Sequence, residues 1–174
     1  MSRNDWVVLD TETTGLSGEI IDLAILNHEG EVIFDALLKP TVNIPREATR
    51  IHGITDEDVE DALSFAALWP SIQKMLLGKR IITYNAQFDR NTFIFTAKRQ
   101  RVELHDMEWE CLMKAYARYR NEPNQYGSPK WHTLHEACTQ QGIEIIQAHR
   151  ALGDAWAAYE LLKRIAKKQG AAAT

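Results

Sequence analysis

Short apolar runs alternate with amphipathic stretches along the chain, which predicts a mixture of strands and helices. Residues 6–10 form a short apolar run rich in β-branched residues, which is typical of a buried strand. Two further apolar segments, 20–26 and 32–38, are joined by Asn27-His28-Glu29-Gly30 and predict a β-hairpin. The first part of the chain is therefore expected to form three consecutive strands.

After Pro40 and Pro45 the spacing of apolar positions becomes mainly helical. Strands are predicted over 80–84 and 109–111, and helices over 62–77, 85–101, 112–120, 131–141 and 151–168. Three strands followed by alternating helices and strands predict an α/β fold with a mixed sheet covered by helices. No composition break or long linker divides the chain, so we expect a single domain over residues 1–174.

The composition narrows the class of protein. The chain of 174 residues has 45% hydrophobic and 25% charged residues, close to the average globular protein. No apolar run approaches the ~20 residues of a membrane helix, and the first residues lack the features of a signal peptide. Cys111 and Cys138 have neither CxxC spacing nor histidines at zinc-ligand distances. These features predict a cytoplasmic protein with reduced thiols and no membrane partner.

The net charge gives a different indication from the motifs discussed below. Twenty Lys and Arg against 24 Asp and Glu leave a formal charge of −4, whereas proteins that bind nucleic acids are usually basic. Two divalent cations held by acidic side chains would bring this charge to zero, since they add +4 to −4. The acidic balance therefore weakens a nucleic-acid interpretation without excluding it.

Two carboxylates end the first predicted strand. In an extended segment, residues two apart point to the same face, so Asp10 and Glu12 can aim at one spot. The same acid-x-acid spacing occurs elsewhere in the chain in polar surroundings, where solvated charge explains it. Asp10 differs from those acids because it terminates a buried strand.

Two more aspartates stand at the head of apolar stripes on predicted helices. The stripes are Phe93, Thr96 and Ala97 after Asp89, and Ala158, Leu161, Leu162 and Ile165 after Asp154. Both carboxylates should therefore face the protein, where a charge is costly unless it is paired or binds a metal. Pairing is one alternative, because Asp89 has Arg90 beside it, and Asp154 has His149 and Arg150 nearby.

His149 lies five residues before Asp154. On one helix this spacing would place the two side chains roughly 140° apart. They can converge only if His149 lies on the loop before the helix.

Three inward-facing acidic positions in one small domain call for a shared explanation. Carboxylate oxygens are the preferred ligands of hard cations such as Mg²⁺ and Mn²⁺, and a Cys/His set for zinc is missing from the sequence. The pattern therefore favours a two-metal hydrolytic site.

Three stretches of the chain resemble the exonuclease motifs of the DnaQ-like 3′–5′ exonucleases, in their order and spacing. They are Asp10-Thr11-Glu12-Thr13-Thr14-Gly15-Leu16, Tyr84-Asn85-Ala86-Gln87-Phe88-Asp89 and His149-Arg150-Ala151-Leu152-Gly153-Asp154-Ala155. A fourth, Ile51-His52-Gly53-Ile54-Thr55, is similar to a segment common in the bacterial proofreading subunit and its relatives. The histidine five residues before the last aspartate matches the DEDDh branch of this family, which also includes exonuclease X-type enzymes.

The resemblance implies a ribonuclease H-like fold, a mixed five-stranded sheet flanked by helices. It also implies metal-dependent hydrolysis of the terminal phosphodiester at a 3′ end, which releases nucleoside 5′-monophosphates. In such an enzyme Asp10, Glu12, Asp89 and Asp154 would hold two Mg²⁺ or Mn²⁺ ions, which generate the attacking hydroxide and stabilise the leaving oxygen. His149 would act as the general base, for which its imidazole must be neutral.

The family also suggests substrate contacts. By resemblance, Thr13 and Leu16 would hold the terminal sugar and stack on the last base, while His52 and Phe88 would line the nucleotide pocket. Phe88 is equally readily interpreted as a core aromatic residue, and His52 as an ordinary loop histidine.

The substrate and the partners stay open at this level. The fourth stretch favours DNA 3′ ends over RNA, with an exoribonuclease as the alternative. The sequence ends just after the last predicted helix, which favours a stand-alone exonuclease, or one recruited to a larger DNA-processing complex, over a replicative proofreading subunit. A non-catalytic binding module of the same fold is a further alternative, but such modules normally lack one of the acids, and all four are present here.

Overall fold

A five-stranded sheet forms the centre of the computed structural model, which describes residues 5–146 and 148–172, with side chains up to Lys167. The strands lie in the order β3-β2-β1-β4-β5. Their bounds are Trp6–Thr13 (β1), Ile20–Asn27 (β2), Val32–Leu37 (β3), Arg80–Thr83 (β4) and Glu108–Cys111 (β5). β1 pairs antiparallel with β2 and parallel with β4, so the sheet is mixed, as predicted.

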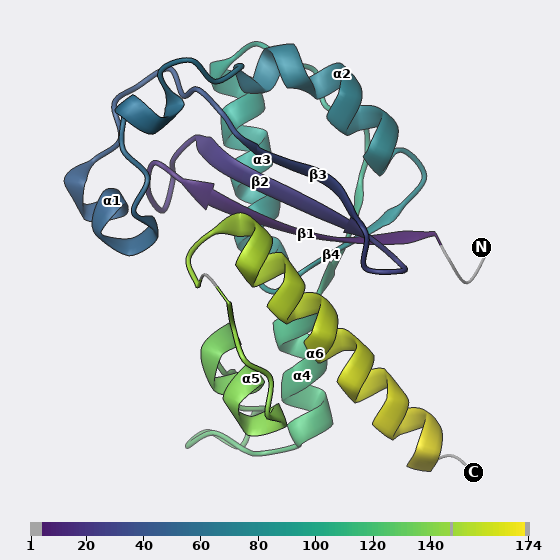
Figure 1. The fold of residues 1–174 in the computed structure, drawn as a ribbon. Coiled ribbons are helices and arrows are strands. Elements are labelled where there is room, and N and C mark those ends of the chain that lie inside the picture. The colour runs from purple at the N-terminus through teal and green to yellow at the C-terminus, as the bar shows by residue number, and fades with distance from the viewer. Residues whose placement is uncertain (1–4, 147, 173–174) are drawn as a thin grey trace.

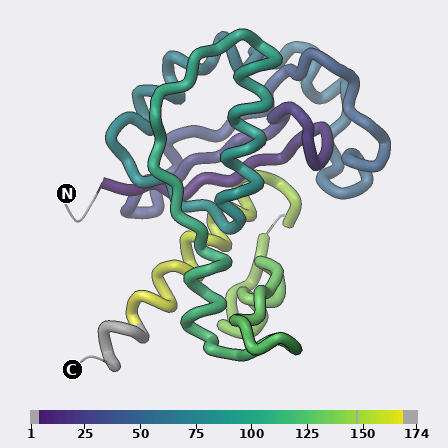
Figure 2. The backbone as a smooth tube through the Cα atoms, turned by 180° about the vertical axis from the view of Figure 1, so that it is seen from behind, coloured from purple at the N-terminus to yellow at the C-terminus, as the bar shows by residue number. Residues whose placement is uncertain are grey.

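Helices cover both faces of this sheet (Figure 1). Their bounds are Arg46–His52 (α1), Phe65–Leu76 (α2), Ala86–Arg99 (α3), Leu112–Arg120 (α4), Leu134–Gln141 (α5) and Ala151–Ala172 (α6), with a short 3-10 helix over Glu57–Val59. Seen from behind, α3 crosses the face of the sheet that is turned toward the viewer, and α4, α5 and α6 form a separate group below the sheet (Figure 2).

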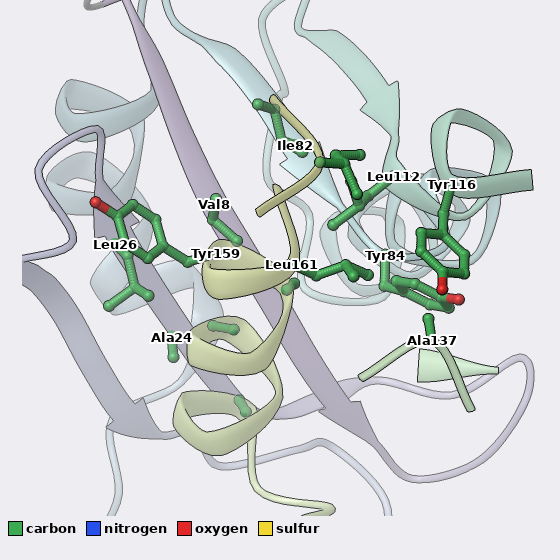
Figure 3. Packing of buried hydrophobic residues seen from close by; sticks show 14 residues of the cluster. Val8, Ala24, Leu26, Ile82, Tyr84, Leu112, Tyr116, Ala137, Tyr159 and Leu161 are labelled. Carbon is green, nitrogen blue, oxygen red and sulfur yellow. The ribbon is translucent and has the colours of Figure 1, made fainter. Parts of the chain in front are cut away.

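The alternation of side chains along β1 divides the core into two layers. Val7 and Leu9 pack with Phe65 of α2 and Phe93 of α3 on one face. Val8 points to the other face, which α6 covers through its small and apolar residues (Figure 3). Because a strand alternates faces, Asp10 and Glu12 continue the α6 side, and Thr11 continues the α3 side.

Several elements differ from the sequence-based expectations. Strand β1 continues to Thr13, beyond the predicted residue 10, and helix α2 begins at Phe65 and not at residue 62. Helix α1 was not predicted, because only Ala48 and His52 of its seven residues are buried and no apolar stripe marks it. Helix α5 begins at Leu134 and not at residue 131, because Thr133 and Glu136 form a capping box in which each side chain accepts from the other's backbone amide.

The unpredicted helix adds to the neighbourhood of the acidic residues. Helix α1 lies beside the carboxyl end of β1, the end that carries Asp10 and Glu12 (Figure 1). Among the described residues, every helix is too short or too polar to cross a bilayer.

The β2–β3 hairpin supplies a test of the packing on the α6 side. Gly30 has φ +90° and a Cβ built on it would lie 2.8 Å from the Tyr159 ring, whereas Gly127, with φ +79°, has open space around it. Both Gly→Ala variants should lose about 1–2 kcal/mol from the strained backbone. Gly30→Ala should lose about 1–3 kcal/mol more from overpacking. Urea unfolding measures both, and equal losses would contradict the close contact with Tyr159.

Candidate active site

Asp10 and Glu12 lie on the last part of β1, on the face that α6 covers. The register of the β1–β2 pair places Asp10 opposite Ala24 and Glu12 opposite Asp22. Both predicted carboxylates therefore point to the same side of the sheet, as their spacing indicated.

Asp89 reaches the same end of β1 from the first turn of α3. Its carboxylate is 3% exposed and accepts a hydrogen bond from Thr11 Oγ1 at 3.0 Å. No ion pair involves Asp89 within the part of the chain that the structure describes, so the alternative of a surface salt bridge with Arg90 is wrong. The aspartate is a buried acid held in place by a neighbouring hydroxyl group.

The third acidic position lies in the first turn of α6. Because α6 begins at Ala151, His149 lies in the segment before the helix, in the left-handed region with φ 62°. This placement lets its ring approach Asp154: ligand atoms of Glu12, His149 and Asp154 all lie within 4.8 Å of one another. The structure thus brings Glu12 together with His149 and Asp154, which lie 137 and 142 positions later in the chain.

Burial raises the pKa of all four acids, and repulsion from neighbouring acids adds to this effect at Asp10 and Glu12. Burial, followed by repulsion from Asp89, Asp154 and Glu12, raises the pKa of Asp10 well above its ordinary value. Burial and the neighbouring acids raise the pKa of Glu12 to about 8. Burial likewise raises the pKa of Asp89 to about 7 and that of Asp154, although the nearby His149 lowers the latter. Without a positive charge among them, the four carboxyl groups do not all ionise readily at neutral pH.

The donor set fits a hard divalent cation. Several carboxylate oxygens and one imidazole converge, and their raised pKa values reflect negative charge that a cation would offset. Cys111 and Cys138 are absent from the cluster of possible ligands among the described residues, as expected for a site without zinc.

A cavity of about 420 Å³ opens beside Glu12. All four residues predicted to contact substrate line it: Thr13 and Leu16 from the end of β1 and its turn, His52 from α1, and Phe88 from the start of α3. Ile51 adds an apolar side chain that the sequence did not single out. Segments from three parts of the chain therefore form one pocket next to the acids.

The individual side chains suit a pocket that is rigid at its base and open at its rim. His52 is 7% exposed, and its Nδ1 accepts a hydrogen bond from the Ile54 amide at 3.0 Å, so Nε2 carries the proton. Its burial lowers its pKa. Phe88 is half-buried and lies outside the described core clusters, which argues against its interpretation as a core residue. Leu16 is 90% exposed at the rim.

Asp22 is a further acid at the site that the sequence reasoning missed. It is 1% exposed, and Arg150 Nε lies 2.8 Å from its Oδ2. The alternative in which Arg150 pairs with Asp154 is therefore wrong. A lone acid inside the apolar run 20–26 was the signal that could have identified Asp22, because an unpaired carboxylate is rarely buried in a strand.

Comparisons with known proteins identify the family of this chain. A family model described as exonuclease matches residues 7–162. An uncharacterised exonuclease of Escherichia phage 186 is 35% identical over 175 residues, which are 95% of this chain and 90% of that protein. A DNA polymerase III subunit epsilon-like protein of Rhodobacter capsulatus is 32% identical, and the aligned region is 95% of this chain but 24% of that protein.

Longer relatives and solved structures extend the comparison. A PolC-type DNA polymerase III of Thermotoga maritima is 29% identical, but the match covers 86% of this chain and 11% of the polymerase. The structure of exonuclease X in complex with 5′ overhanging duplex DNA superposes with a TM-score of 0.75, at 24% identity over 95% of this chain and 93% of that one. The nuclease domain of 3′hExo, a DEDDh family member bound to rAMP, gives 0.77 at 18% identity, covering 96% and 94%. This likeness confirms the ribonuclease H-like fold.

The raised pKa values predict how the metal-free protein responds to pH. An acid whose pKa is higher in the folded than in the unfolded chain stabilises the fold only at low pH. That stability is lost as pH rises toward about 7 for Asp89 and about 8 for Glu12. In EDTA the free energy of unfolding should therefore fall between pH 5 and pH 8.5. A tenfold difference between the folded and unfolded ionisation constants of one acid corresponds to about 1.4 kcal/mol.

Thermal or urea unfolding across this range measures the effect. Glu12→Gln should flatten the decline, because the neutral amide cannot ionise, and Mn²⁺ should stabilise wild type more at pH 8 than at pH 5. Identical pH dependence in Glu12→Gln and wild type would show that the cluster is not its source.

Proposed function

The chain belongs to the exonuclease family, and from this premise we propose that it is a 3′–5′ exonuclease of the DEDDh type that releases nucleoside 5′-monophosphates from DNA. The observation that carries the proposal is the meeting of four carboxylates and His149 beside one apolar pocket. A hydrolytic centre and a site for a terminal nucleotide lie next to each other, and Glu12 belongs to both.

The four acids are the ligands we assign to two divalent cations, Mg²⁺ or Mn²⁺. Asp10 and Glu12 come from one strand, while Asp89 and Asp154 come from helices on opposite faces of the sheet. Bound there, the cations would activate water for attack on phosphorus and neutralise charge at the leaving oxygen. In this arrangement the buried position of Asp89 and its bond from Thr11 keep one ligand fixed.

His149 is the group we assign to accept the proton of the attacking water. Its side chain is exposed, within 4.8 Å of ligand atoms of both Glu12 and Asp154. A neutral imidazole there has one nitrogen free to take a proton, while the adjacent carboxylates stabilise the imidazolium that forms.

The pocket is the site we assign to the terminal nucleotide. Leu16 at its rim and Phe88 on its wall offer apolar surfaces to a base, and Thr13 and His52 offer polar atoms near a sugar. Thr13 Oγ1 donates to the Gly15 carbonyl at 2.8 Å, which holds the turn that carries Leu16.

We propose DNA as the substrate because several relatives are named for DNA polymerase III, and exonuclease X was solved with duplex DNA. The 3′hExo nuclease, solved with rAMP, represents the alternative of a 3′–5′ exoribonuclease. Since the chain spans 11% to 24% of the polymerase-type relatives, recruitment to a larger DNA-processing complex belongs to the proposal as well.

The direct test uses 5′-labelled single-stranded DNA and the matching RNA. With Mg²⁺ or Mn²⁺, the label should remain on products that shorten one nucleotide at a time from the 3′ end, faster on DNA. EDTA should abolish the ladder, Asp10→Ala should lower the rate by several orders of magnitude, and His149→Ala by about 10²–10⁴-fold.

A measurement of strand binding distinguishes an enzyme from a non-catalytic binding module of the same fold. An Asp10→Ala protein that still binds the strand while losing cleavage supports an enzyme. Binding by wild type with no cleavage of either strand, in either metal, would refute the exonuclease proposal, and a faster ladder on RNA would overturn the choice of DNA.

The rim of the pocket provides a second test. Leu16→Ala should raise the KM for DNA about tenfold, because burying a leucine against a base stabilises the complex by about 1.5–3 kcal/mol. Leu77→Ala is the matched control, since Leu77 is 63% exposed at the end of α2, next to the start of β4 and away from the pocket. An equal KM for the two variants would mean that Leu16 does not contact the substrate.

A further inference from the structure

Asp22 connects strand β2 to the start of α6, the helix that carries Asp154. It lies on β2, directly opposite Glu12, and its carboxylate is almost entirely buried. One oxygen, Oδ2, accepts two hydrogen bonds, from Arg150 Nε at 2.8 Å and from the Ala151 amide at 3.1 Å. These bonds connect positions 128 and 129 residues apart in the chain.

The two donors stand at the very start of α6. Ala151 is the first residue of that helix, so its amide has no partner within the helix, and Asp22 supplies one from another strand. The Arg150 carbonyl accepts the Asp154 amide at 3.0 Å, which is the first hydrogen bond of the helix. Holding Arg150 therefore also holds the turn from which Asp154 projects.

The residue just before this anchor is His149. Its φ of 62° lies in the left-handed region, which few residues other than glycine adopt, although histidine adopts it more often than most. The His149 side chain is exposed and gains little from packing. The Asp154 carboxylate accepts a hydrogen bond from the His149 backbone, so this backbone is held both by Asp154 and, one residue further on, by the Arg150 and Ala151 contacts with Asp22.

From this geometry we propose that Asp22 and Arg150 are a positioning pair, which sets His149 and Asp154 at their distance from Glu12. The inference rests on the proposed role of His149 as proton acceptor. Neither member of the pair needs to touch the substrate; the pair acts through the backbone at the start of α6. Loss of the pair should leave the pocket intact and misplace the imidazole.

A second arginine in the chain makes a matched control. Arg99, the last residue of α3, lies 3.7 Å from the buried carboxylate of Glu19, and its side chain is 45% exposed, against 44% for Arg150. Arg99→Gln and Arg150→Gln thus remove the same charge, at the same exposure, from a buried acid. Only Arg150 adjoins His149.

The experiment compares kinetics and local structure in the two variants. Arg150→Gln should lower kcat by about 10–100-fold, the effect of a small misplacement of a catalytic group, at a nearly unchanged KM. Arg150→Lys should recover part of the loss, and Arg99→Gln should match wild type. By NMR in the metal-free protein, Arg150→Gln should speed hydrogen exchange of the Ala151 amide and shift the His149 ring signals, while Arg99→Gln changes neither.

Each other outcome overturns the inference. Equal losses of kcat in the two Gln variants would indicate a general effect of stability, and a raised KM with unchanged kcat would make Arg150 a substrate contact. Unchanged His149 signals in Arg150→Gln would disprove positioning even if the rate falls. If wild type cleaves no strand, the proposed function fails, and the NMR comparison still decides whether the pair positions His149.

Discussion

The cost of holding four carboxylates together, largely out of water, is the constraint on which the rest of the structure depends. Asp10, Glu12, Asp89 and Asp154 come from a strand and two helices; burial raises the pKa of each, and repulsion from the other acids raises those of Asp10 and Glu12 further. Such an arrangement is unfavourable by itself, so the packed layers of the sheet must hold it together. A divalent cation would offset this cost through its attraction to the carboxylates, which is why residues that destabilise the metal-free protein suit metal binding.

The strand β1 distributes this chemistry between the two faces of the sheet. Its alternation turns Asp10 and Glu12 toward α6, while Thr11 turns toward α3 and donates to Asp89. One strand can therefore join acids from helices on opposite sides while its pairing with β2 stays in register from Val7 to Glu12, and the register shifts only between Glu12 and Thr13. The two hydrophobic layers that flank it provide the rigidity that ligand positions within a few tenths of an ångström require.

The functional groups differ in how firmly the surrounding structure holds them. Asp89 is buried and hydrogen-bonded, Asp154 lies in a helical turn, and His149 is exposed on a left-handed residue before the helix. Leu16 stands almost fully exposed at the pocket rim. The groups assigned to hold cations are thus the fixed ones, whereas those assigned to move a proton or meet the substrate lie where the chain can adjust.

Local pattern determined most of the elements and the inward direction of the acids, because apolar periodicity and two-residue alternation are properties of short segments. The motifs that contain Asp10 and Glu12, Asp89, and His149 and Asp154 likewise indicated the exonuclease family, and the comparisons established it. Only the tertiary structure decided that α1 forms, that His52 and Phe88 line one pocket with Leu16, and that Arg150 pairs with Asp22 and not with Asp154. Those outcomes depend on sheet register and on helix packing between segments far apart in sequence, and no window of the sequence contains both partners.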